Sequence, residues 1–264
     1  MNKLFFLAIS AAFLVGLIAG SPLWAKGQAD VTNGVHNLSA TGVDPWYGTP
    51  GSSIYATDEQ QVCIFCHTPH GGSLTGPLWN RNNPSSTWSH YNSATLSSYL
   101  QGLSTSRPIN DESLLCMSCH DGSISVNHII NEPNDRATAI VTSFTGDPDT
   151  EIIDFFGVTA GARIGGSSAN TGGTGDLSDD HPISFSYTQV LNSPEYQPSG
   201  AKYGDLKLQS LAEGAGVRFF GADSNVECSS CHDPHVDYLS NPDYAPFLVT
   251  PNTGSNLCFA CHDK

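Results

Sequence analysis

Charged residues are scarce in this 264-residue chain, and basic ones are the scarcest. They make up 13% of the sequence, with 10 Lys and Arg against 25 Asp and Glu, so the formal net charge is -15. An acidic surface of this kind offers no basic patch to phosphates or anionic lipids, which excludes nucleic acid as a binding partner. It favours cationic partners or divalent ions.

Cysteine is absent before Cys63, and long apolar runs are absent after Gly20. The first absence excludes a lipid-modified cysteine at the amino terminus. The second excludes membrane insertion of the mature chain, because a spanning helix needs about 20 apolar residues.

The amino terminus has the pattern of an export signal. Lys3 precedes an uncharged run from Leu4 to Gly20, and a polar segment follows Ala25. This pattern predicts a secretory signal peptide over residues 1–25, with an uncleaved anchor helix as the alternative. The mature chain, residues 26–264, is expected to be one exported domain.

All eight cysteines fall into four copies of Cys-X-X-Cys-His. The copies are Cys63, Cys66 and His67; Cys116, Cys119 and His120; Cys228, Cys231 and His232; and Cys258, Cys261 and His262. This spacing is typical of c-type haem attachment, in which two thiols form thioethers and the adjacent imidazole binds iron. Zinc knuckles and short-loop disulfides are the competing interpretations. Neither accounts for a histidine after every second cysteine, so we predict four haem c groups.

Composition predicts a fold with little regular structure. With 26 Gly and 16 Pro, long helices and strands are not expected. We predict a multihaem cytochrome c that is mostly coil, with short helices, few strands and the haems forming the core. Short helical segments are expected over residues 112–120 and 256–262, and a short strand over residues 183–187.

The second axial ligand of each iron must come from another side chain. Methionine is not available, because Met1 leaves with the signal peptide and Met117 lies between two attachment cysteines. Histidine is therefore expected on both faces of each iron, and without a Met ligand the reduction potentials should be low. Six histidines lie outside the motifs: His36, His70, His90, His128, His181 and His235.

Two of these histidines follow the first and third motifs directly, as Thr68-Pro69-His70 and Asp233-Pro234-His235. Two imidazoles on opposite faces of one iron need Cα atoms about 12 Å apart. Three extended residues span only about 10–11 Å. His70 and His235 are therefore expected to reach a different haem from that of their own motif, or to remain free.

Several segments resemble those of multihaem cytochromes from metal-reducing bacteria, in particular the tetrahaem outer-surface cytochromes that polymerise into conductive filaments. The segments are residues 36–42, 62–70, 77–80, 115–122, 180–183 and 228–235. The resemblance extends from about residue 36 to residue 264 and is weakest over residues 137–175. It implies a continuous stack of haems with histidine on both faces, one of them completed by a histidine of the next subunit.

Carried over by position, the resemblance implies distal ligands at His36, His70, His181 and His235. His36 lies near the amino terminus and is the candidate for donation to a neighbouring subunit. His90 and His128 match no ligand position and are expected to be exposed or locally hydrogen-bonded.

Three functions fit these expectations. The first is an extracellular homopolymer that carries electrons at the outer cell surface to partner cytochromes or external acceptors. The second is a monomeric tetrahaem shuttle in the periplasm. The third is a reductase with one open haem site, which six spare histidines make less favourable. We therefore expect an electron carrier and not an enzyme.

Overall fold

The computed structural model describes residues 31–42, 56–73, 76–84, 87–121, 128–133, 164, 176–196 and 205–263. The expected signal peptide over residues 1–25 lies outside these ranges. Within them, none of the helices has the length and apolar character needed to cross a membrane.

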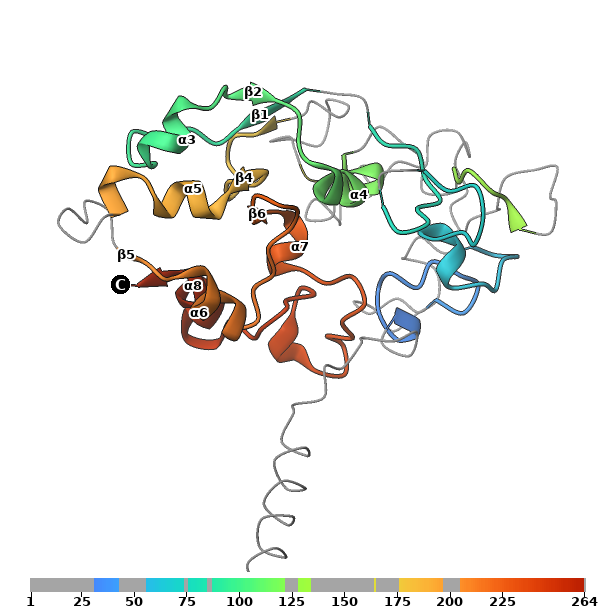
Figure 1. The fold of residues 1–264 in the computed structure, drawn as a ribbon. Helices are drawn as coiled ribbons and strands as arrows, with labels where there is room; N and C mark the ends of the chain where they lie inside the picture. The colour runs from blue at the N-terminus through green and yellow to red at the C-terminus, as the bar shows by residue number, and fades with distance from the viewer. Residues whose placement is uncertain are drawn as a thin grey trace, which may run out of the picture.

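Helices are short throughout the described chain (Figure 1). The longest is α4 (Asp111–His120), at 10 residues. The other α-helices are α3 (Ser98–Gly102), α5 (Tyr187–Leu191), α6 (Gln209–Gly214), α7 (Cys228–Cys231) and α8 (Asn256–Cys261). Four 3-10 helices complete the helical set: η1 (Cys63–Phe65), η5 (Pro194–Tyr196), η6 (Pro242–Tyr244) and η7 (Thr253–Ser255).

Strands are two or three residues long and pair segments distant in sequence. β1 (Trp88–His90) lies between β2 (Ser106–Arg107), which is antiparallel to it, and β3 (Asp176–Leu177), which is parallel. β4 (Phe185–Ser186) pairs with β6 (Asn225–Val226), and β5 (Asp205–Leu206) pairs with β7 (His262–Asp263). Ladders this short cannot hold a fold by themselves.

The coarse fold prediction is confirmed, since the described chain is mostly coil with short helices and few strands. The predicted helical segments correspond to α4 and α8. The predicted strand over residues 183–187 is shorter, comprising only Phe185–Ser186. Ser184 has a left-handed backbone with φ 56°, and the Ser186 hydroxyl accepts a hydrogen bond from the Gln189 N–H, which starts α5 at Tyr187.

Buried apolar side chains of the described residues form four separate clusters. Three of these clusters contain a buried residue from within a cysteine motif: Phe65, Met117 and Ala260. Serines are prominent among the buried polar residues, and Ser39, Ser113, Ser118 and Ser230 have no exposed surface. The described polypeptide thus packs as small apolar groups around the motifs, linked by buried polar contacts.

Glu227 is the centre of one such polar contact, between the helices that carry the second and third motifs. Only 1% of Glu227 is exposed. Its carboxylate accepts hydrogen bonds from Asn110 Nδ2 at 2.6 Å, Ser113 Oγ at 2.6 Å and Ser184 Oγ at 2.9 Å. Ser113 Oγ also accepts a bond from the Cys228 N–H at 3.1 Å.

Glu227 also begins α7, where it forms a capping box with Ser230. One carboxylate therefore joins three segments: α4 with the second motif, α7 with the third, and the stretch that follows His181. In Figure 1, α4 and α7 lie next to each other at the centre of the molecule.

Replacing Glu227 with Ala should destabilise the protein by about 2–4 kcal/mol, because the Asn110 amide and two serine hydroxyls would lose their buried acceptor. Replacing it with Gln should cost about 1–2 kcal/mol, since one acceptor oxygen and the shape remain. Urea unfolding of the purified protein measures both effects.

Glu213→Ala is the matched control, because Glu213 is exposed on α6 and accepts one bond from Gln209 Nε2. It should change stability by less than about 0.5 kcal/mol. Equal losses for Glu213→Ala and Glu227→Ala would show that Glu227 does not hold these segments together.

Candidate functional site

Each cysteine motif forms a single helical turn that places its two cysteines on one face. The cysteines are three residues apart, and positions i and i+3 of a helix are neighbours. In three motifs the histidine N–H donates to the carbonyl of the first cysteine: His67 to Cys63, His232 to Cys228 and His262 to Cys258. His232 and His262 end their helices in extended backbone, with ψ 143° and 135°.

Cysteines of successive motifs lie near enough to influence one another's pKa. Burial and the neighbouring Cys119 thiol raise the pKa of Cys66 to about 12. A hydrogen bond with Cys228 raises the pKa of Cys116, and burial followed by Cys261 raises the pKa of Cys231 to about 11. Each of these influences comes from a cysteine of the next motif along the chain. In a chain with haem attached the sulfurs would be thioethers, which do not titrate.

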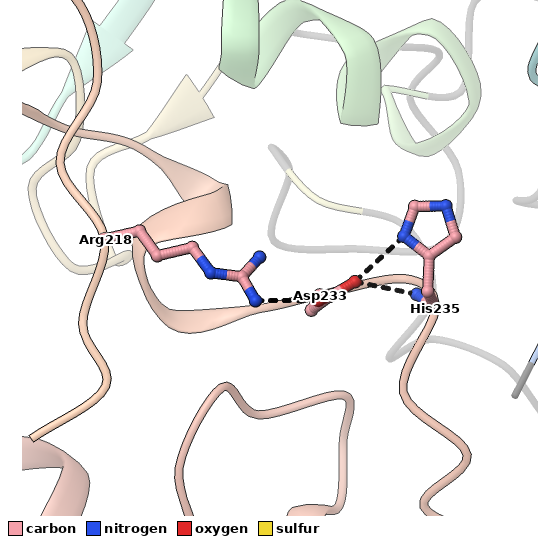
Figure 2. Close-up of polar contacts among 3 residues, drawn as sticks. All are labelled: Arg218, Asp233 and His235. Carbon is pink, nitrogen blue, oxygen red and sulfur yellow. Dashed lines mark hydrogen bonds and ion pairs between the residues drawn. The ribbon is translucent and has the colours of Figure 1, made fainter. Parts of the chain in front are cut away.

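His235, which follows the third motif, lies beside His67 of the first motif. Their ring centroids are 6.4 Å apart and the ring planes differ by 13°. The expectation that His235 reaches the haem of a different motif, or remains free, stays a prediction. Nδ1 of His235 donates to Asp233 Oδ1 at 3.0 Å, as Figure 2 shows, and Nδ1 of His67 donates to the Pro77 carbonyl at 2.9 Å.

His36 lies beside His120 of the second motif, with ring centroids 6.1 Å apart and an interplanar angle of 81°. The ring also packs on Phe247 at 4.4 Å. Burial, and then the nearby His120, lower the pKa of His36 to about 3, so its imidazole is neutral at pH 7. Nδ1 of His36 is buried without a hydrogen-bond partner among the described residues.

His36 lies beside a motif histidine of its own chain, and its donation to a neighbouring subunit stays a prediction. Its segment is folded back on its own chain, where the Asn37 side chain bonds to Thr32 and Ser39 and the Ala56 N–H donates to the Leu38 carbonyl. These bonds fix the backbone that follows His36.

Both histidine pairs have the spacing that one haem iron requires. Two iron–nitrogen bonds of about 2.0 Å, plus the distance from each nitrogen to its ring centre, separate the centroids by roughly 6 Å. The donor set also fits, because iron in a porphyrin takes two protein ligands. No cluster of three or more His, Cys, Asp or Glu suited to a metal ion occurs in the described ranges.

Hydrogen bonds also leave the required ring nitrogen available. His67, His181 and His232 have Nδ1 within 2.8–2.9 Å of the carbonyls of Pro77, Pro182 and Pro246. A carbonyl accepts only from a protonated Nδ1, so Nε2 keeps its lone pair for a metal. A cleft of about 520 Å³ lies against the first motif and is lined in part by Cys63, His67 and Leu78. Its volume falls within the range of cofactor pockets.

The other proposed distal ligands are placed less closely. His70 and His181 are both exposed. His70 is held through its backbone, since its carbonyl accepts bonds from Thr68 Oγ1 and Asn131 Nδ2. Within the described ranges, no ring contact links His70 or His181 to the third or fourth motif. The structure therefore does not identify a partner for either histidine.

Three residues, Trp79, Asn80 and Arg81, connect the first two motifs. The sequence did not predict this connection. Trp79 packs edge-on against His67 with centroids 5.5 Å apart, and its Nε1 donates to Ser118 Oγ within the second motif at 3.2 Å. Asn80, fully buried, donates to the Ile64 carbonyl at 2.7 Å. Arg81 is also fully buried and donates to the Ser118 carbonyl through Nε and Nη2.

His90 and His128 lie as expected for histidines that are not ligands. His128 is exposed. His90 is buried in β1, and its Nε2, the nitrogen that a haem ligand needs, is 3.2 Å from the Arg107 carbonyl. Burial, followed by the charge of Arg107, lowers the pKa of His90 to about 4.

No protein-family model matches this chain, and a search of curated proteins finds no relative.

His90 should make the protein less stable in acid. It is neutral when folded and has an unperturbed pKa of 6.5, so protons favour the unfolded chain as the pH falls from about 6.5 toward about 4. His90→Gln keeps an amide donor for the Arg107 carbonyl but does not titrate. Its urea midpoint should therefore fall less than that of the unmodified protein between pH 7 and pH 4.5.

His128→Gln is the control, since it removes an exposed histidine. It should leave the pH dependence unchanged. An identical pH response in His90→Gln and the unmodified protein would contradict the assignment of His90 as a buried neutral histidine.

Proposed function

We propose that this protein is an electron carrier with four c-type haems, each held by two cysteine thioethers and two histidines. The observation that carries the proposal is that two motif histidines each lie beside a histidine from outside the motifs. His67 lies 6.4 Å from His235, and His120 lies 6.1 Å from His36, between ring centroids. Haem supplies the one-electron iron chemistry that the side chains lack.

The eight motif cysteines attach the cofactor and the four motif histidines provide the proximal ligands. His235 and His36 provide the distal ligands for the first and second motifs. His70 and His181 are left for the third and fourth motifs, His232 and His262, from this copy or a neighbouring one. With histidine on both faces of each iron, the protein relays electrons and has no open position for a substrate.

The fold itself supports a core made largely of cofactor. Four small apolar clusters and a set of buried serines offer little continuous apolar surface, yet three clusters include residues within cysteine motifs. A porphyrin attached at each motif would join these clusters and supply the missing apolar contact.

We further propose that copies of the chain polymerise into an extracellular filament that passes electrons to partner cytochromes or external acceptors. This part rests on the resemblance to filament-forming tetrahaem cytochromes. It is also supported by the exposed Leu208, Leu211 and Phe259, which are 65%, 57% and 40% exposed around the packed helices α6 and α8. Apolar side chains gathered next to the fourth motif need to be covered by cofactor or by another copy.

A monomeric periplasmic shuttle is the second candidate, and the same histidine pairing supports it. A reductase with an open haem is less favoured, because four histidines outside the motifs remain for four distal positions even when His90 and His128 are set aside.

Replacing His235 with Ala should convert one of the four haems from low-spin to high-spin, because the iron bound at His67 would lose an axial ligand. Electron paramagnetic resonance of the oxidised protein measures this. Near-parallel and near-perpendicular axial imidazoles split the iron orbitals differently and give distinct low-spin signals. The signal that disappears should be the one from near-parallel rings, since the pair His67 and His235 differs by 13°.

His90→Ala is the matched control and should leave all four haems low-spin. A pyridine-haemochrome assay should find four haems in each variant. Fewer than four haems in the unmodified protein, or a low-spin spectrum unaffected by His235→Ala, would contradict the proposed ligands.

Filament and shuttle are separated by negative-stain microscopy of material sheared from cells that produce the protein. Filaments that disappear when the protein is absent are expected. Exclusively monomeric protein, recovered with the periplasmic fraction, would instead identify the shuttle and leave the haem ligation untouched.

A further inference from the structure

We propose that Asp233 lowers the reduction potential of the haem held between His67 and His235, and that Arg218 opposes this effect. The inference rests on the proposed function and deepens it, by naming the two side chains that set the potential of one centre. Both lie outside the ligand set, and Asp233 acts through His235, so it is a positioning residue.

The three side chains form a chain of contacts that Figure 2 shows. Asp233 Oδ1 accepts both the backbone N–H of His235 at 2.9 Å and the ring Nδ1–H at 3.0 Å. Asp233 Oδ2 accepts a bond from Arg218 Nη2 at 2.9 Å. The Asp233 side chain is only 5% exposed, whereas those of Arg218 and His235 are 49% and 43% exposed.

This geometry fixes both the position and the charge of the carboxylate. Three donors converge on its two oxygens, and the Asp233 N–H is bonded to the Phe247 carbonyl at 2.7 Å. The acceptor that faces His235 is therefore a buried, oriented negative charge.

A carboxylate that accepts the Nδ1 proton makes the imidazole a stronger electron donor through Nε2. Stronger donation stabilises ferric over ferrous iron, so one-electron reduction becomes harder and the potential falls. The Arg218 guanidinium withdraws charge from the same carboxylate and weakens the effect. Its side chain is half exposed, so solvent screens part of its influence.

The other histidines with a defined Nδ1 partner have a different acceptor. His67, His181 and His232 donate to neutral carbonyls of Pro77, Pro182 and Pro246. His235 donates to a carboxylate. The iron that it binds should therefore have a more strongly electron-donating ligand than irons bound by histidines that donate to carbonyls. That difference would set the potential of this centre apart from the potentials of centres whose histidines donate to carbonyls.

The test is a potentiometric titration of the haem-loaded protein, followed through the low-spin resonance of the near-parallel imidazole pair. Asp233→Asn keeps an oxygen that accepts the Nδ1–H but removes the charge. The potential of this one haem should rise. We expect about a tenfold change in the ferrous-to-ferric ratio at a fixed applied potential, the lower end of outer-shell effects. For one electron this is about 59 mV.

Arg218→Gln should move the same potential in the opposite direction, because it leaves the carboxylate less neutralised. Asp243→Asn is the matched control, since Asp243 is exposed in η6 and the substitution changes the net charge equally. It should leave the resonance and its potential unchanged. Opposite shifts in potential for Asp233→Asn and Arg218→Gln support the inference. If the two substitutions only loosened the orientation of the His235 ring, both shifts would have the same sign.

An unchanged potential in Asp233→Asn, or a shift equal to that of Asp243→Asn, would overturn the inference. So would shifts of the same sign in the Asp233 and Arg218 variants. If Asp233→Asn fails to load four haems, Arg218→Gln decides by itself. The proposal is then rejected if the potential of this haem does not fall in Arg218→Gln. Failure of the proposed function is distinct, because the unmodified protein would then lack four low-spin haems before any titration begins.

Discussion

The pairing of imidazoles from segments far apart in the sequence is the constraint on which the rest of this structure depends. His235 can meet His67 only if the third motif lies close to the first, and His36 can meet His120 only if the amino-terminal segment folds back on the second motif. Each pair thus acts as a tertiary contact between regions that share almost no regular secondary structure. In the proposed holoprotein, metal coordination would make these contacts far stronger than ring packing.

Buried polar side chains hold the described segments together, as a continuous apolar core does in an ordinary domain. Glu227 joins the second and third motifs through hydroxyl and amide donors, and Asn80 joins residues 77–80 to the first motif. Such contacts are directional, so they position the motifs closely with few residues. They also tolerate little change, because a buried donor that loses its acceptor is not hydrated.

A buried polar contact of this kind also lies beside His235. Asp233 is buried and charged because a guanidinium and a histidine N–H compensate it, and the direction of its Oδ1 is determined by the turn through Pro234 to His235. In the proposed holoprotein, a residue adjacent to a motif histidine would in this way act on the haem of a different motif. The short sequence between a proximal and a distal histidine would then connect two redox centres both physically and electrostatically.

The sequence by itself determined the local chemistry and the character of the fold. Four Cys-X-X-Cys-His motifs, the lack of a free methionine, and abundant Gly and Pro depend on composition and spacing within a few residues. They predicted the short helices α4 and α8 and the sparse strands. Chain reach also predicted that His235 reaches a different haem from that of its own motif or remains free.

Only the tertiary structure decided which imidazoles meet. His36 lies beside His120 of its own chain and packs on Phe247, next to a segment held by the hydrogen bonds of Asn37. His235 lies beside His67. The contact of Asp233 with Arg218 and the role of Glu227 were likewise not predictable from the sequence. Contacts of this kind depend on how loops distant in sequence pack together, and the spacing of residues along the chain does not predict that packing.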